Sequence, residues 1–337
     1  MTDFYELTPA DQARRLEAAG REALRQWDIG DATLELIKHR ENAVFKVEKD
    51  GFRAALRMHR HGYHTDDELR SELQWMQALS DAGVKVPDII PTTSGELFID
   101  VHASDLPGAL QIDLFDWING EQLGSVEEGV ADAAAVEHQF RTLGELAARV
   151  HNQAVPWSLP EGFTRHAWDA DGLAGEQPFW GRFWEIENAT DEQRQLLERA
   201  RDRIYAELGA MPKSPGSYSM IHADFAAENI MVDGDDVRLI DFDDAGFGWH
   251  LFELVTALYF IRDEDYFERA QDALIEGYRT HRQLTDEDLQ KLPLFYLARG
   301  TTYVGWVHTR SETDTARELT PMIVDMVCAL ADDYLST

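Results

Sequence analysis

Residues 221–244 read IHADFAAENIMVDGDDVRLIDFDD, and they combine two short apolar runs with a high density of carboxylates. The runs at 230–232 and 237–240 flank the dipeptide Asp233-Gly234, which favours the positive φ angles of a tight turn. The pattern predicts a β-hairpin, set in a part of the chain that is otherwise helical in pattern from about residue 126 onward.

Three polar residues stand at the open end of this predicted hairpin. Asn229 precedes the first strand, Asp241 follows the second, and Asp224 lies on the loop before them. Amide and carboxylate oxygens are the ligands that Mg²⁺ prefers, and a further carboxylate can accept a proton from a hydroxyl. We therefore expect Asn229 and Asp241 to bind the metal, and Asp224 and Asp241 to be the catalytic residues. The alternative is a solvated acidic hairpin, which we expect to hold for the turn residues Asp233, Asp235 and Asp236.

The first third of the chain is rich in strand patterns. Lys49-Asp50-Gly51 is a strong hairpin signal. A helix is expected at 65–82, with Thr65 as its N-cap, and an amphipathic helix at 9–27. Short β-type runs, enough for a five-stranded sheet, lie at 34–37, 43–47, 52–58, 97–101 and 110–115.

The expected fold class is therefore α+β. A small lobe with an antiparallel sheet and one main helix is expected at 1–115, and a larger, mostly helical lobe at 116–337.

Composition and charge restrict the partners. Of the 337 residues, 44% are hydrophobic, which is typical of globular rather than disordered proteins. The 63 Asp and Glu outnumber the 31 Lys and Arg and give a formal charge of −32. This charge argues against a nucleic acid and against an anionic membrane surface as partners. A small cationic substrate, a salt-rich cell interior or solubility alone would each account for it.

Cysteine content and hydropathy restrict the compartment. Cys328 is the only cysteine, which excludes an intramolecular disulfide and a cysteine zinc cluster. The N-terminus lacks the apolar core of a signal peptide, and the longest apolar stretch, 254–261, is much shorter than a membrane span. We therefore expect a soluble, cytoplasmic protein.

The spacing His222-x-Asp224-x4-Asn229, followed by Asp241 at the end of a hairpin, resembles the catalytic loop of protein-kinase-like enzymes. The likeness is greatest to the phosphotransferase family that includes aminoglycoside, choline and homoserine kinases. Within it, the stretch LRMHRHGY at 56–63 resembles bacterial stress-response kinase A and its relatives. The resemblance implies a two-lobed protein-kinase-like fold and MgATP-dependent phosphoryl transfer to a hydroxyl.

The same resemblance implies a nucleotide site in the small lobe. It predicts a basic residue on the third strand and a glutamate on the next helix, which here are Arg57 and Glu72. Arg57 would hold the α- and β-phosphates with its planar fork, and Glu72 would orient it. Phe115 and Trp117 would line the hinge beside the adenine. The alternative for Arg57 is a surface arginine on a strand, and the alternative for Phe115 and Trp117 is the end of a core strand.

Three positions depart from the pattern of regulated protein kinases or of this family. No Gly-x-Gly-x-x-Gly lies between the first two strands; Glu41 and Asn42 occupy the turn, where backbone N–H groups would contact phosphate or simply close a hairpin. Ala223 replaces the arginine that a phosphorylated activation loop needs. Glu253 stands where this family usually has aspartate.

Several histidines and aromatic residues near these motifs are expected to be structural. We expect His222 to brace the loop rather than to transfer protons, and His151 to be structural. The spacing of four aromatic residues favours packing on one face of a helix, with a substrate wall as the alternative: Phe179, Trp180, Phe183 and Trp184.

These observations predict an ATP-dependent kinase that uses Mg²⁺. The acceptor stays open between a protein Ser/Thr and a small amino alcohol such as homoserine, choline or an aminoglycoside. The alternative from another class is a catalytically silent nucleotide-binding pseudokinase or scaffold. The presence of Asp224, Asn229 and Asp241 argues against it, since a scaffold needs none of the three.

Overall fold

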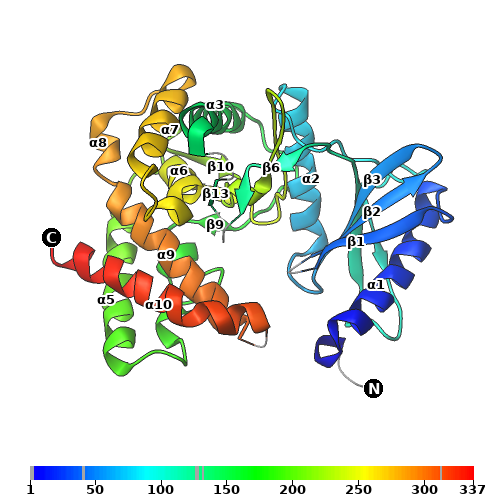
Figure 1. The fold of residues 1–337 in the computed structure, drawn as a ribbon, viewed down its shortest axis with the longest axis horizontal. Coiled ribbons are helices and arrows are strands. Elements are labelled where there is room, and N and C mark those ends of the chain that lie inside the picture. Colours follow the sequence, from blue (N-terminus) through cyan, green and yellow to red (C-terminus); the bar gives the residue numbers. More distant parts are fainter. Residues whose placement is uncertain (1–3, 40–41, 126–128, 131–132, 312) are drawn as a thin grey trace. The chain divides into compact units, whose positions relative to one another are not determined.

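The computed structural model describes residues 4–39, 42–125, 129–130, 133–311 and 313–337. The chain divides into two compact units (Figure 1). Unit 1 comprises 1–121, 159–164 and 231–240, and unit 2 comprises 122–158, 165–230 and 241–337. The expected boundary between residues 115 and 116 stays a prediction.

Unit 1 is built on a five-stranded antiparallel sheet, as predicted. The strands follow the order β1-β2-β3-β5-β4, with bounds β1 (Thr33–His39), β2 (Ala43–Lys49), β3 (Phe52–Met58), β4 (Phe98–Val101) and β5 (Leu110–Asp116). Asp50 and Gly51 join β2 to β3 with φ angles of 49° and 86°. These are the two positive φ angles that a type I′ turn requires, so the Asp-Gly signal identified the turn correctly.

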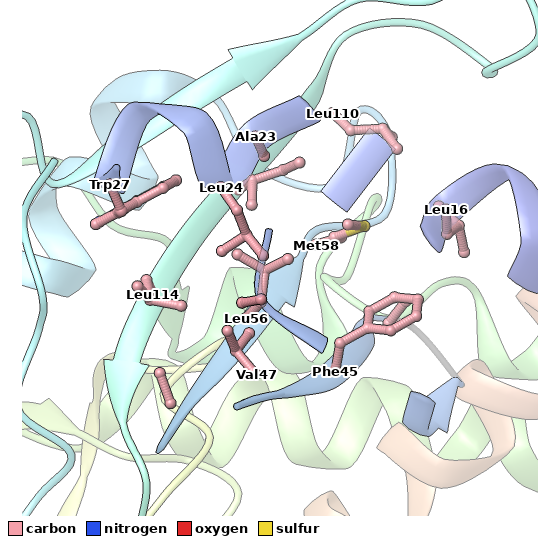
Figure 2. Close-up of a cluster of buried hydrophobic side chains, with 14 of the residues drawn as sticks. Leu16, Ala23, Leu24, Trp27, Phe45, Val47, Leu56, Met58, Leu110 and Leu114 are labelled. Carbon is pink, nitrogen blue, oxygen red and sulfur yellow. The ribbon is translucent and has the colours of Figure 1, made fainter. Parts of the chain in front are cut away.

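One face of this sheet is covered by the N-terminal helices η1 (Phe4–Glu6), α1 (Pro9–Ala23) and η2 (Leu24–Trp27). The expected single helix at 9–27 therefore ends in a turn of 3₁₀-helix. Leu16, Leu24 and Trp27 pack against alternate residues of the strands (Figure 2). The strand side of this core comprises Phe45, Val47, Leu56, Met58, Leu110 and Leu114. Alternation along the strands turns these side chains to one face, which explains why this sheet could be read from sequence.

Helix α2 (Asp66–Asp81) has Thr65 as its N-cap, as predicted. Thr65 forms a capping box with Glu68.

A hairpin from much later in the chain also belongs to unit 1. It consists of β11 (Ile230–Asp233) and β12 (Asp236–Leu239), with Gly234 at a φ of 62° in the turn. The Leu239 N–H donates to the carbonyl of Lys85 at 3.1 Å, which ties this hairpin to the segment after α2.

Unit 2 is mostly helical. Its helices are η3 (Ala133–Ala135), α3 (Val136–Ala154), α4 (Ala170–Ala174), η4 (Phe183–Glu185), α5 (Asp191–Ala210), η5 (Ala227–Asn229), α6 (His250–Leu258), η6 (Tyr259–Ile261), α7 (Phe267–His281), α8 (Asp286–Leu289), α9 (Leu292–Thr309) and α10 (Asp314–Leu335). Short strands complete it: β7 (Gly124–Ser125), β8 (Gly129–Val130), β9 (Ala167–Trp168), β10 (Tyr218–Ile221) and β13 (Gly246–Trp249). Strand β6 (Glu121–Gln122) spans the boundary between the two units.

Two glycines let α3 and α7 pack closely. A Cβ atom at Gly144 would lie 2.0 Å from the carbonyl oxygen of Leu274, and one at Gly277 would lie 2.0 Å from that of Arg141. Any other residue would force the helices apart. Strand β10 enters the sheet order β10-β13-β9, and its end at Ile221 delivers the chain to the loop that carries Asp224.

The structure corrects one expectation in this unit. The four aromatic residues at 179–184 do not share a helix, because Gly181 takes a φ of 108° and the chain forms a turn followed by the short η4. The four aromatic residues therefore lie on a turn and a short 3₁₀-helix rather than on one face of an α-helix. Within the part of the chain that the structure describes, no helix has both the length and the apolar composition needed to cross a membrane.

Candidate active site

Asp224 and Asn229 lie side by side on the loop between β10 and β11. The Asn229 amide donates to the Oδ2 of Asp224 at 2.6 Å and to the Asp224 carbonyl at 2.9 Å. Asn229 is buried, whereas 24% of the Asp224 side chain is exposed. With its amide nitrogen turned to Asp224, Asn229 offers its amide oxygen as a ligand.

Glu253 fixes the backbone of this loop. It lies on α6 with no exposed surface, and its two carboxylate oxygens accept the N–H groups of His222 and Ala223 at 2.8 and 2.7 Å. Burial raises the pKa of Glu253, although the two backbone hydrogen bonds and the charges nearby favour its ionised form. The residue that replaces the usual aspartate therefore binds two consecutive amides of the loop.

Ala223 has a strained backbone. Its φ is 64°, in the left-handed region that costs a residue with a Cβ about 1–3 kcal/mol. Such a conformation persists where surrounding groups hold it, and here the N–H is bound by Glu253. The Ala223 carbonyl accepts a hydrogen bond from Nη1 of Arg299 at 3.0 Å. Both ends of the strained peptide are thus held by buried charged side chains.

The histidines behind the loop make structural contacts. The rings of His151 and His250 stack with centroids 4.1 Å apart, and burial lowers the pKa of both far below its ordinary value. His151 pairs with the hydroxyl of Tyr278, and His250 with that of Ser219, each at 2.9 Å. Nδ1 of His222 accepts the Asp224 N–H at 3.3 Å, a contact that braces the loop.

Asp241 stands at the same end of the β11–β12 hairpin as Asn229, because the two strands are antiparallel neighbours and these residues flank their open ends. Asp241 is half-buried and takes a φ of 65°, a second left-handed residue in this region. An amide oxygen and a carboxylate are hard ligands, so the donor set fits a cation such as Mg²⁺. The expected roles of Asp224, Asn229 and Asp241 stay predictions.

Arg57 and Glu72 meet in unit 1. Nη2 of Arg57 lies 2.8 Å from Oε1 of Glu72, and neither side chain is appreciably exposed. The same arginine binds Asp113 on β5 with two hydrogen bonds, from Nε at 3.1 Å and from Nη2 at 2.7 Å. Nε2 of His59 lies 3.1 Å from the Asp113 carboxylate. Burial alone would raise the pKa of Asp113, but Arg57 and His59 outweigh it and lower that pKa below its ordinary value.

The remaining residues of the expected nucleotide site each make their own contacts. The Asn42 side chain accepts the Arg60 N–H at 3.2 Å, and Glu41 lies outside the described residues. Phe115 is buried, with its ring centroid 4.9 Å from the Arg57 guanidinium. Trp117 is half-buried, and the amino group of Lys46 lies 5.6 Å from its ring. Contact between these residues and a nucleotide stays a prediction.

Sequence reasoning missed Asp113, His59 and Arg299. Arg299 lies on α9, and its Nη2 donates to Oδ1 of Asp224 at 2.9 Å. It is the one Asp, Glu, Lys or Arg between residues 292 and 309, all of which the structure describes. A lone charge in an apolar helix was the signal that could have found it, because a buried charge needs partners.

The chain matches a family of known proteins over most of its length. The model of the phosphotransferase enzyme family (APH) matches residues 33–291. A microcompartment-associated aminopropanol kinase has a solved structure that superimposes with a TM-score of 0.83 at 31% identity, covering 95% of this chain and 98% of that chain. The homoserine kinase of Agrobacterium fabrum (strain C58) is 27% identical over 287 residues, which is 83% of this chain and 81% of the relative.

A further solved structure is amicoumacin kinase hAmiN in complex with AMP-PNP, Ca²⁺ and Ami. It superimposes with a TM-score of 0.72 at 18% identity and covers 88% of each chain. These matches confirm the predicted kinase-like α+β fold and the predicted family resemblance.

Proposed function

The chain belongs to the phosphotransferase enzyme family and is an ATP-dependent kinase, and from this premise we propose that it transfers the γ-phosphoryl group to the hydroxyl of a small amino alcohol. One observation carries the proposal. The carboxylate of Asp224 is partly exposed, while the groups that hold it, Asn229 and Arg299, are buried. A carboxylate presented in this way by a rigid frame suits a group that meets an incoming hydroxyl.

In this proposal the protein contributes position and charge rather than covalent chemistry. Asp224 orients the acceptor hydroxyl and accepts its proton as the phosphoryl group leaves ATP. Asn229 and Asp241 hold Mg²⁺, which when bound neutralises charge on the β- and γ-phosphates. Arg57, held by Glu72, contacts the α- and β-phosphates.

The acceptor class rests on two observations. The relative that is 31% identical over nearly the whole chain is an aminopropanol kinase. The formal charge of −32 would concentrate a cationic substrate near the protein and repel an anionic one. A small molecule that carries both a hydroxyl and an ammonium group fits both.

A screen with labelled ATP and Mg²⁺ tests the proposal. The acceptors are 1-amino-2-propanol, L-homoserine, choline, an aminoglycoside and casein as a protein substrate. We expect label on at least one amino alcohol and none on casein. Absence of turnover with every acceptor would support a silent nucleotide-binding protein instead, and label on casein alone would support a protein kinase.

Two variants refine the screen. Asp224→Asn should lower kcat by about 10² or more, the usual weight of a general base, while MgATP still binds. Asp235→Asn is the matched control, because Asp235 lies exposed at the tip of the same hairpin. Its turnover should equal that of the wild type.

A further inference from the structure

Arg299 is a fully buried cation whose contacts converge on the loop of Asp224. Its Nη2 donates to the Asp224 carboxylate at 2.9 Å, and its Nη1 donates to the Ala223 carbonyl at 3.0 Å. Nε donates to the hydroxyl of Tyr303 at 3.0 Å. Each guanidinium nitrogen therefore has an acceptor, as the burial of a charge requires.

Aromatic rings surround the same guanidinium group. The ring centroids of Tyr303, Trp180 and Phe252 lie 4.5, 5.1 and 5.4 Å from its central carbon. Burial alone would lower the pKa of Arg299, but Tyr303 and Asp224 outweigh it and raise that pKa, so the side chain stays charged. The rings also limit its rotation, since a cation–π contact is lost when the planar group turns away. Arg299 is thus held in one orientation before any ligand binds.

We propose that Arg299 is a positioning residue for phosphoryl transfer, which fixes both the carboxylate of Asp224 and the strained peptide that precedes it. The inference rests on the proposed function, because it assigns Asp224 the acceptor hydroxyl. Arg299 binds Oδ1 of Asp224, and Asn229 binds Oδ2, so the plane of the carboxylate is set from two sides. An orientation fixed in advance shortens the search for a reactive geometry and favours transfer to the acceptor over transfer to water.

A purely structural role for Arg299 is the competing explanation. In that case it serves only to hold Ala223 at its positive φ. The two explanations differ in what a glycine at 223 does, since glycine takes a positive φ without strain. Ala223→Gly should restore the stability lost with Arg299 in either case. It should restore turnover only if strain is the whole role of Arg299.

The experiment compares Arg299→Met, Arg299→Lys and the double variant Ala223→Gly/Arg299→Met with the wild type. Arg201→Met is the matched control. Arg201 binds a backbone carbonyl, that of Ala174, and a carboxylate, that of Glu176. Like Arg299 it also lies over aromatic rings, but on α5 and without contact to the loop. The measurements are kcat and KM with ATP and 1-amino-2-propanol or L-homoserine, the ATP hydrolysed per acceptor phosphorylated, and the melting temperature.

We expect Arg299→Met to lower kcat by about 10²-fold, the usual effect of a small misplacement, with KM for ATP within about twofold. The ratio of ATP hydrolysed to acceptor phosphorylated should rise. Arg299→Lys should lose less, about tenfold, because it keeps the charge but cannot hold two acceptors with one planar fork. The double variant should regain melting temperature and not kcat. Arg201→Met should change only the melting temperature.

Several results would overturn the proposal. They are an unchanged kcat in Arg299→Lys, recovery of kcat in the double variant, or an equal loss of kcat in Arg201→Met. If Arg299→Met does not fold, the kcat values of Arg299→Lys and of the Arg201→Met control still decide between the two explanations. If the wild type phosphorylates no acceptor, the proposed acceptor class fails while Arg299 is still testable. Hydrogen exchange of the segment 221–229 should then be faster in Arg299→Lys than in Arg201→Met, and equal exchange would refute the role.

Discussion

The guanidinium of Arg57 and the carboxylate of Asp113 face each other through two hydrogen bonds, from Nε to Oδ1 at 3.1 Å and from Nη2 to Oδ2 at 2.7 Å. The Nε–Nη2 edge of the guanidinium therefore binds a carboxylate on the adjacent strand. Glu72 shares Nη2 from the helix side at 2.8 Å. Arg57 is thus fixed from two directions before a nucleotide binds, and such preorganisation lowers the entropy cost of binding.

Asp113→Asn tests how much the ion pair between Arg57 and Asp113 contributes to the free energy of unfolding. Removing one partner of a buried ion pair leaves the other charge poorly compensated, so the free energy of unfolding should fall by about 3 kcal/mol at pH 7. The pKa of Asp113 is lowered in the folded state, so its stabilising contribution is present above its unfolded pKa of about 3.8 and is lost as the pH falls through the folded value. Urea unfolding at pH 5 and 3 should show a smaller difference in the free energy of unfolding between the two proteins at pH 3 than at pH 5. A difference that is the same at pH 3 would show that the ionised carboxylate is not what stabilises the fold.

Arg57→Lys keeps the charge and changes the geometry. A lysine offers a point charge without parallel N–H donors, and the loss of one charge-assisted hydrogen bond is worth about 1.5–3 kcal/mol. We expect kcat/KM for ATP to fall about tenfold to hundredfold, while the KM of the acceptor hardly changes. Glu72→Gln should give a smaller defect in the same direction.

The double variant Arg57→Lys/Glu72→Gln then measures coupling. If the two side chains act as one unit, its effect on kcat/KM for ATP should be smaller than the sum of the single effects. Simple additivity, together with unchanged ATP kinetics in Arg57→Lys, would remove Arg57 from the nucleotide site.

Local sequence signals predicted the framework of this protein well. Asp50-Gly51 marked one hairpin because few dipeptides take positive φ at low cost, and Gly234 marked the turn of the other, where it takes a φ of 62°. Thr65 marked the start of a helix because its hydroxyl can cap a backbone N–H. Each of these signals lies within a few residues of the feature it specifies, so one sequence is enough to read it.

Long-range pairs could not be read in the same way. Asp113 lies 56 residues from Arg57, and Arg299 lies 75 residues from Asp224. The residues around each of these side chains do not indicate which distant residue it binds. The signal common to these pairs is a charged residue inside an otherwise apolar element, as at Asp113, Glu253 and Arg299. Such a residue indicates that a buried charge has a partner, but not which residue the partner is. The aromatic residues at 179–184 misled for the opposite reason, because helical spacing also arises by chance in a turn built around Gly181.

Asp241→Asn probes the metal site with little change to the backbone. Asp241 takes a φ of 65°, and asparagine tolerates the left-handed region better than alanine does, so the variant should fold normally. An amide oxygen is a weaker ligand for Mg²⁺ than a carboxylate, so affinity for ATP should fall at least about tenfold in the presence of Mg²⁺. Calorimetry with and without Mg²⁺ separates the effects, since binding without the metal should not weaken. Equal MgATP affinity in the variant and the wild type would exclude Asp241 as a ligand.

Gly144→Ala tests the close packing of α3 against α7 that supports the region behind the loop. The added Cβ would lie 2.0 Å from the Leu274 carbonyl oxygen and 2.7 Å from the Tyr278 nitrogen, both of them backbone atoms that cannot rotate aside. Overpacking of this kind costs about 1–3 kcal/mol, and we expect the upper end of that range in urea unfolding. Gly209→Ala is the control, because Gly209 also lies in a helix but has open space around its would-be Cβ. There the better helix propensity of alanine should raise the free energy of unfolding by about 0.5–1 kcal/mol. The two substitutions are chemically identical, so opposite signs would assign the loss at Gly144 to contact between α3 and α7. A gain in stability at both sites would show that the two helices can move apart freely.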